Sequence, residues 1–410
     1  MKPETILYII LGITAFDYIY SQILDFLNSN ALKPTVPSEI KEFYDEEKYQ
    51  KSQEYHKVLS RFSFFSSTFS FVISFLVLYL GGFGWLDSFL RPLFSNELYL
   101  SLVFFGVLFI LSDLSSIPFS LYSTFVIEER FGFNKTTPKL FIMDKLKGYL
   151  LTIVIGGTLI SLLLYLITTI GSSFWLYFWL VAGVFMLFVN MFYTSLILPL
   201  FNKLTPLEDG ALKLAIEDYS EKVSFPLDNV YVIDGSKRSS KANAFFSGLG
   251  KRKMIVLYDT LINNHTTEEL VAVLAHEVGH YKHKHIFGGL FISVAQIGLM
   301  LFIMSLMIYS ENTSLALGGS QMAIHLNLLA FGILYSPISS ILGILGNMLS
   351  RKNEYEADAY AKDTYDGLAL EKALKILSVD NLSNLYPHPA YVFFHYSHPT
   401  LLSRLNALRS

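Results

Sequence analysis

Residues 272–280 read Ala272-Val273-Leu274-Ala275-His276-Glu277-Val278-Gly279-His280. This stretch contains the pattern H-E-x-x-H. On a helix, positions i and i+4 share a face, so both imidazoles can reach a single zinc ion. Glu277 is rotated off that face, where its carboxylate can contact a water molecule at the metal. The stretch therefore predicts a helix that carries a metal site, and the alternative is an amphipathic helix with two solvated histidines.

The residues before the motif are typical of a helix start. Thr266 or Thr267 can cap the first turn, and Glu268 and Glu269 favour its positive end. An apolar face follows, which indicates that the motif helix packs against a core.

The third ligand must be His, Asp or Glu, because the chain has no cysteine. Residues 350–360 offer Asn353, Glu354, Glu356 and Asp358. Glu354 and Asp358 are four residues apart, so they point the same way on a helix. We expect Glu354 to bind one zinc ion per chain and Asp358 to accept a hydrogen bond from a ligating histidine. We also expect Asn353 to lie next to the ligands and support them without binding the metal. Without the upstream motif, this segment would instead indicate a charged helix leaving a membrane.

The composition indicates a membrane protein. Of 410 residues, 52% are apolar and only 16% are charged, and the mean hydropathy is +0.43. Soluble proteins contain about 25% charged residues. The net charge of −3 gives no general attraction to nucleic acid. Seven apolar runs are long enough to span a bilayer; they lie at residues 5–27, 64–86, 98–121, 148–171, 174–200, 286–309 and 324–349.

Lysine and arginine alternate between the two sides of these runs. The segments before, between and after the runs contain one, six, one, five, none, eleven, none and seven such residues. Because basic residues are retained on the cytosolic side, we expect the N-terminus outside the cytosol and the C-terminus inside it. Asp17, Asp113 and Asn190 lie within the runs, where they either line an internal chamber or form interhelical hydrogen bonds.

The chain divides into two predicted parts. Residues 1–200 contain five membrane runs, and residues 201–410 contain the motif and the last two runs. Within the second part we expect a helix from Glu208 to Val223, short strands near residues 230–233 and 254–257, and a helical C-terminal segment that is interrupted at residues 386–399.

Asn353-Glu354 with Asp358, following H-E-x-x-H, resembles the gluzincin peptidases, whose third ligand is that glutamate. The chain from about residue 40 onward resembles the type I CAAX prenyl protease family of membrane-embedded zinc metalloproteases. The matching segments beyond the zinc motif are Lys51–Tyr55, Ile127–Thr136, Asn243–Phe245, Ile255–Thr260, and Ser397-His398-Pro399 followed by Arg404.

The resemblance implies a mainly α membrane protein in which seven transmembrane helices form a barrel around a large internal chamber. The zinc metalloprotease domain, with a small β element, would lie on the cytosolic side. Glu277 would be the catalytic base, and His398 would donate to the oxyanion. Asn243 and Arg404 would bind the substrate backbone as an added strand. Each of these last three residues also has a structural alternative. Asn243 could be a turn residue, His398 part of a structural break at Pro399, and Arg404 a solvated charge.

The resemblance also implies cleavage near the C-terminus of prenylated Cys-a-a-X proteins. In a bacterium, turnover of damaged or membrane-bound polypeptides would be the more plausible role, so the membrane is either a bacterial inner membrane or the endoplasmic reticulum. A different alternative is an inactive transporter or scaffold with structural zinc. We expect a monomer in the bilayer that acts on peptide or protein substrates. His283 and His285 alternate with lysine, which indicates a basic face beside the membrane rather than a second metal site.

Overall fold

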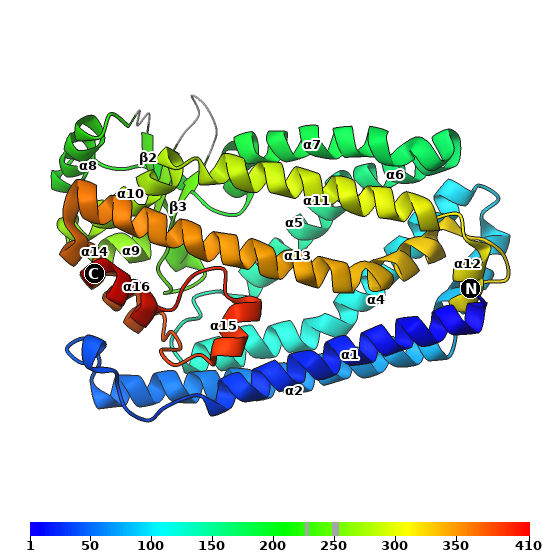
Figure 1. Cartoon of the computed structure of the whole chain (residues 1–410), viewed down its shortest axis with the longest axis horizontal. Coiled ribbons are helices and arrows are strands. Elements are labelled where there is room, and N and C mark those ends of the chain that lie inside the picture. The colour runs from blue at the N-terminus through cyan, green and yellow to red at the C-terminus, as the bar shows by residue number, and fades with distance from the viewer. Residues whose placement is uncertain (226–228, 248–253) are drawn as a thin grey trace.

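Long helices that run along one axis make up most of the molecule (Figure 1). The computed structural model describes residues 1–225, 229–247 and 254–410. The N-terminus lies at one end of the long axis, and the C-terminus lies at the other end near helix α10 (Thr267–Lys282). The prediction of a mainly helical protein is confirmed.

Six helical segments within the described ranges are long and apolar enough to cross a membrane. The fourth, Pro138–Leu200, has 63 residues and includes both the fourth and the fifth predicted runs. The helices of these segments are α1 (Pro3–Asn30), α2 (Glu46–Tyr79), α4 (Glu97–Tyr122), α5 (Pro138–Leu151), α6 (Gly157–Ile170), α7 (Phe174–Phe192), α11 (His285–Met307) and α13 (Ile324–Ala361), which continues into α14 (Gly367–Asp380).

Large apolar side chains cover the outside of these helices. Phe65, Leu180 and Phe291 are 67%, 69% and 75% exposed. Leaving such a side chain in water instead of burying it costs about 1.5–3 kcal/mol. A hydrocarbon environment removes this cost, so the exposed surface is that of a multi-pass membrane protein.

One predicted run does not match a single helix. The run at 64–86 is divided because α2 ends at Tyr79 and Gly81 adopts a left-handed conformation with φ 69°. The short helix α3 (Gly82–Leu90) then packs closely on the turn after α12 (Glu311–Ala316). A Cβ atom on Gly84 would lie 2.0 Å from the carbonyl carbon of Gly318, so only glycine fits this contact.

The polar residues predicted inside the membrane runs make local contacts. Asp17 accepts a hydrogen bond from Ser336 Oγ at 2.8 Å and thereby joins α1 to α13. Asp113 accepts one from Lys145 Nζ at 2.7 Å and joins α4 to α5. Asn190 donates to a carbonyl of its own helix. Interhelical hydrogen bonding, one of the two alternatives, therefore holds for both aspartates.

A four-stranded sheet lies at the same end of the long axis as the C-terminus (Figure 1). Its strand order is β1-β2-β4-β3, and β3 forms one edge of the described sheet. β2 and β4 are parallel, whereas the outer pairs are antiparallel. The strands are β1 (Leu204–Pro206), β2 (Asn229–Ile233), β3 (Ala244–Ser247) and β4 (Met254–Tyr258). Helix α8 (Ala211–Lys222) lies between β1 and β2, and α9 (Asp259–Asn264) follows β4.

Helix α10 packs against α13 at the end where the sheet lies. Gly279 makes this contact close, because a Cβ atom there would lie 3.0 Å from the Cα atom of Ala357 and 3.1 Å from the Cβ atom of Tyr360. The chain then returns over α10 through α14, and α15 (Pro389–His395) and α16 (Leu401–Arg409) follow. The predicted interruption at residues 386–399 therefore contains the short helix α15.

Adding one methyl group at Gly279 tests this contact. We expect Gly279→Ala to lower the free energy of unfolding by about 1–3 kcal/mol, because overpacking forces the two backbones apart. It should also lower metal content, since Glu354 moves with α13. Gly346→Ala on α13 is the control, because nothing lies within 4 Å of its Cβ position. Thermal unfolding and metal analysis in detergent measure both effects; equal values for the two variants would contradict the close contact.

Candidate active site

Helix α10 presents the two histidines of the motif. Its start is fixed by a capping box, in which Thr266 Oγ1 accepts from the Glu269 N–H at 3.3 Å and Glu269 Oε2 accepts from the Thr266 N–H at 3.0 Å. The predicted cap is therefore Thr266. The Nε2 atoms of His276 and His280 lie 3.2 Å apart on one face.

Helix α13 brings Glu354 to the same point. One Glu354 oxygen lies 3.4 Å from His276 Nε2, and the other lies 3.2 Å from His280 Nε2. Zinc binds nitrogen or carboxylate ligands at about 2.0–2.2 Å, and tetrahedral geometry then separates the ligand atoms by about 3.3 Å. The three measured separations match that value, so these side chains fit a metal ion.

The burial of Glu354 supports this fit. Its side chain is only 6% exposed, and its Oε2 atom is buried without a hydrogen-bond partner among the described residues. His276 Nε2 lies 3.4 Å from this oxygen, and Arg404 Nη1 lies 3.5 Å from it. A buried carboxylate oxygen without a donor is destabilising, and a bound cation would offset that cost.

Asp358 and Arg404 orient His276 through its Nδ1 atom, on the side of the ring away from the metal ligands. Asp358 Oδ1 lies 2.9 Å from His276 Nδ1, the contact expected from their spacing. Arg404 donates two hydrogen bonds to Asp358, from Nε at 2.8 Å and from Nη2 at 2.6 Å. The two fixed donors orient the carboxylate and therefore the imidazole. In this structure Arg404 contacts Asp358 rather than a strand edge, so a substrate-binding role for it stays a prediction.

Glu277 follows His276 on α10 and is partly buried. Burial raises the pKa of Glu277 above its ordinary value, while the neighbouring charges of His276 and His280 act in the opposite direction. A carboxylate with a raised pKa is a better proton acceptor near neutral pH. This is the property that a catalytic base requires.

His398 lies on the segment between α15 and α16, and its Nε2 atom is 3.4 Å from Glu354 Oε1. Its side chain is 63% exposed, and together with His395 and Arg404 it lines a cavity of about 560 Å³. His398 therefore lies at the cavity and also next to the ligand Glu354.

The two remaining predicted residues lie apart from the ligands. Asn243 is exposed immediately before the edge strand β3, and its side-chain oxygen accepts from the Ala244 N–H at 2.8 Å. Asn353 is half-buried beside Glu354 and forms no hydrogen bond with either histidine in the described ranges. The substrate-binding role of Asn243 and the supporting role of Asn353 therefore stay predictions.

Sequence reasoning missed a contact between His285 and His280. The two Nδ1 atoms lie 2.9 Å apart, and His285 Nε2 lies 3.0 Å from Glu356 Oε2. The prediction of a basic face beside the membrane did not include this contact. No spacing rule indicates it, because residues five apart do not meet on one helix.

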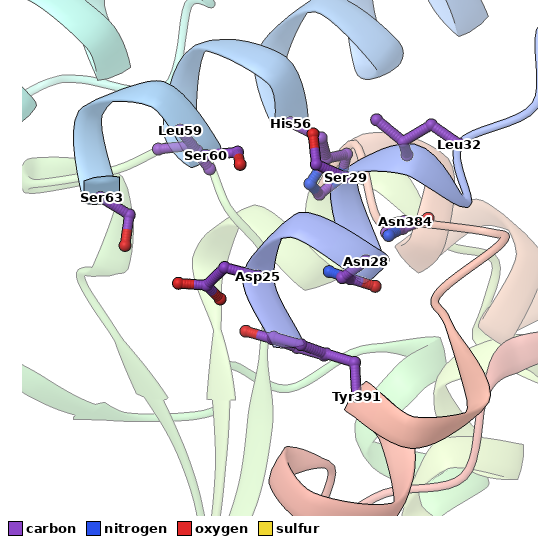
Figure 2. Close-up of a pocket in the computed structure, with 10 residues that line it drawn as sticks. All are labelled: Asp25, Asn28, Ser29, Leu32, His56, Leu59, Ser60, Ser63, Asn384 and Tyr391. Carbon is purple, nitrogen blue, oxygen red and sulfur yellow. The ribbon is translucent and has the colours of Figure 1, made fainter. Parts of the chain in front are cut away.

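A second, polar cavity of about 190 Å³ lies where α1 and α2 meet the C-terminal segment (Figure 2). Asp25 and Asn28 of α1 face it beside Tyr391 of α15, and His56 of α2 lies across from them. Asn384 lines this cavity and also the cavity beside His398, so the two are neighbours.

A buried H-E-x-x-H helix joined to membrane helices defines a membrane-embedded metallopeptidase. Two families match the chain: CAAX prenyl protease N-terminal, five membrane helices, at residues 26–203, and Peptidase family M48 at residues 206–410. The chain belongs to the type I CAAX prenyl protease family, and it is a metalloendopeptidase.

Individual relatives match over most of their length. The probable CAAX prenyl protease 1 of Schizosaccharomyces pombe is 40% identical, over 92% of this chain and 82% of its own. The CAAX prenyl protease 1 of Saccharomyces cerevisiae is 35% identical, over 98% and 94%. The crystal structure of S. mikatae Ste24p superimposes with a TM-score of 0.93, at 33% identity and over 99% of both chains.

Metal binding should release a proton. Burial lowers the pKa of His276, but hydrogen bonds with Asp358 and Glu354 outweigh this and raise it to about 9 without a metal. Below pH 9 the metal-free imidazole is therefore protonated, and a metal must displace the extra proton. The zinc affinity should fall about tenfold for each unit by which the pH is lowered. Calorimetry of zinc binding at pH 7, in buffers of different ionisation enthalpy, measures the release. A zinc affinity that does not change between pH 7 and 8.5 would contradict it.

Proposed function

We propose that the chain is a zinc metalloendopeptidase that cleaves prenylated CAAX-type proteins near their C-terminus. The observation that carries this proposal is the convergence of His276, His280 and Glu354. The two Nε2 atoms lie 3.2 Å apart, and each lies 3.2–3.4 Å from one of the two Glu354 oxygens, close to the ligand separations of tetrahedral zinc. Its proposed substrate follows from the names of the relatives, which are CAAX prenyl proteases.

The proposed mechanism assigns one task to each side chain. Zinc, when bound, lowers the pKa of water and polarises the scissile carbonyl. Glu277 accepts the proton of the attacking water and later gives it to the leaving nitrogen. His398 is exposed and close to the ligands, so it is free to donate a hydrogen bond to the oxyanion. Asp358 orients His276, and Asn353 supports the neighbouring ligand Glu354 on α13.

The substrate would bind as an added strand. β3 is an edge of the described sheet, and an edge offers unpaired backbone groups to a peptide. Asn243 immediately precedes this strand, and Arg404 lines the cavity beside His398. These positions support the proposal that both residues hold the substrate backbone. The chain has no cysteine, so the prenylated thiol would belong to the substrate alone.

We infer seven membrane helices around an internal chamber. The segment Pro138–Leu200 is far longer than one crossing, which needs about 20 residues. Gly171 has φ 71° between α6 and α7, and these helices contact each other, which supports two crossings. A cavity of about 710 Å³ lies between α2, α3 and α4 and is lined by eight serines and by apolar side chains. The serines, which would suit water in such a chamber, are Ser66, Ser67, Ser70, Ser74, Ser112, Ser115, Ser116 and Ser120.

The proposed orientation follows the basic residues. The segments rich in lysine and arginine would face the cytosol, together with the C-terminus and the active site, and the N-terminus would lie outside. The similarity to fungal relatives favours the endoplasmic reticulum over a bacterial inner membrane. Residues 1–200 would form the membrane domain and residues 201–410 the peptidase domain of a monomer.

Two other functions compete with this proposal. A quality-control protease would share the site but cleave unprenylated polypeptides. A transporter or scaffold would hold structural zinc. Structural sites use four protein ligands, whereas three converge here among the residues that the structure describes.

Cleavage of a quenched farnesylated peptide by the purified protein in detergent separates these functions. We expect cleavage that a chelator abolishes and zinc restores, with slower cleavage of the same peptide without its prenyl group. Equal rates on both peptides would favour the quality-control role. Zinc-loaded protein that cleaves neither this peptide nor an unfolded polypeptide would favour the scaffold.

Two substitutions test the roles within the site. Glu277→Gln should retain zinc and lower turnover by about 10²–10⁴-fold, because the proton acceptor is lost. Glu354→Ala should lower the zinc content, because one of three ligands is lost. Metal analysis and peptide cleavage measure the two effects. Parental turnover by Glu277→Gln, or an unchanged zinc stoichiometry in Glu354→Ala, would reject the corresponding role.

A further inference from the structure

His285 is the first residue of α11, yet its imidazole contacts the zinc helix that precedes it. Its Nδ1 atom lies 2.9 Å from Nδ1 of His280, and its ring lies nearly perpendicular to that of His280, at 5.1 Å between centroids. The His285 side chain is only 10% exposed. The contact is therefore made by a side chain packed in the folded interior and not by a mobile side chain on the surface.

The backbone between α10 and α11 creates this contact. Lys284 adopts the left-handed conformation, with φ 58° and ψ 29°. Such a conformation costs of order 1 kcal/mol for a residue other than glycine, and it persists where the surrounding structure requires it. It turns the chain so that His285 comes back onto His280.

The contact determines which nitrogen carries each hydrogen. If His280 binds zinc through Nε2, its Nδ1 atom carries the hydrogen and must donate it. The acceptor at 2.9 Å is His285 Nδ1, so the hydrogen of His285 is on Nε2. That atom in turn lies 3.0 Å from Glu356 Oε2, which accepts it.

We propose that His285 is a positioning residue. It accepts a hydrogen bond from the zinc ligand His280 and is itself held in place by donating a hydrogen bond to Glu356. This proposal rests on the proposed zinc site. His276 is held in the same manner by the buried Asp358. For His280, an intervening imidazole bridges to Glu356, whose side chain is 37% exposed and lies 3.5 Å from Lys352 Nζ.

The same residues could suggest a second metal site. Ligand atoms of His283, His285 and Glu356 lie within 4.8 Å of one another. The imidazole rings of His283 and His285 are stacked, with 5.5 Å between their centroids. However, a cation on His285 Nε2 would need the lone pair of that atom, and its hydrogen would then move to Nδ1. Two hydrogens would then oppose each other across 2.9 Å, so zinc on His280 disfavours a second cation on this atom of His285.

Two substitutions separate the two hydrogen bonds of His285. Asparagine places its side-chain oxygen near the position of Nδ1, so His285→Asn keeps an acceptor for His280. Glutamine places its polar atoms near Nε2, so His285→Gln loses that acceptor. We expect His285→Ala and His285→Gln to weaken zinc binding about 10–100-fold, as loss of such supporting partners does, and His285→Asn to restore most of it. Glu356→Gln should have a smaller effect.

Competition with a chelator of known affinity measures zinc binding by the full-length variants in detergent, and cleavage at saturating zinc gives kcat and KM separately. We expect the defect mainly in zinc affinity and kcat, with KM unchanged. His283→Ala is the matched control and should bind zinc as the parent does. Thermal unfolding of the metal-free variants shows that each one folds.

The possible outcomes are distinct. Parental zinc affinity in folded His285→Ala would overturn the positioning role, as would equal defects in the Asn and Gln variants. A second bound zinc that is lost in His283→Ala would overturn it in favour of a second metal site. Parental zinc affinity in His280→Ala would instead reject the zinc site itself, and with it the proposed function.

Discussion

The close contact between α10 and α13 is the constraint on which the site depends. The motif supplies two histidines from one helix, but the glutamate lies more than seventy residues later in the chain. Gly279 lets the second backbone approach, and Glu354 then lies one turn before Ala357, the residue that Gly279 contacts. The glycine inside the motif therefore has a packing role that the chemistry of H-E-x-x-H alone does not require.

Membrane and catalytic parts are joined without long linkers. α11 begins three residues after α10 ends, and α13 extends from the membrane part directly to Glu354. Two of the elements that build the site are therefore continuous, or nearly so, with membrane helices. This arrangement attaches the metal ligands directly to helices that are long and apolar enough to cross a membrane.

The sequence predicted features that depend on local periodicity. The motif helix, its cap and the long apolar helices follow from spacing, and Glu354 follows from its position after an apolar run. Features that depend on a single backbone angle could not be predicted. Gly81 divides a continuous apolar run, and Lys284 turns His285 onto His280, although nothing in its side chain indicates a left-handed conformation. The pairing of Arg404 with Asp358 depends on tertiary packing between distant helices.

The position of Arg404 in the chain has a consequence for the order of assembly. Arg404 follows every membrane helix in the sequence, and it fixes the carboxylate that orients His276. During synthesis the histidines emerge first, Glu354 and Asp358 follow with α13, and the arginine comes last. The complete site can therefore form only after α16 has been made, so a nascent chain would not be a fully assembled protease beside its own unfolded segments.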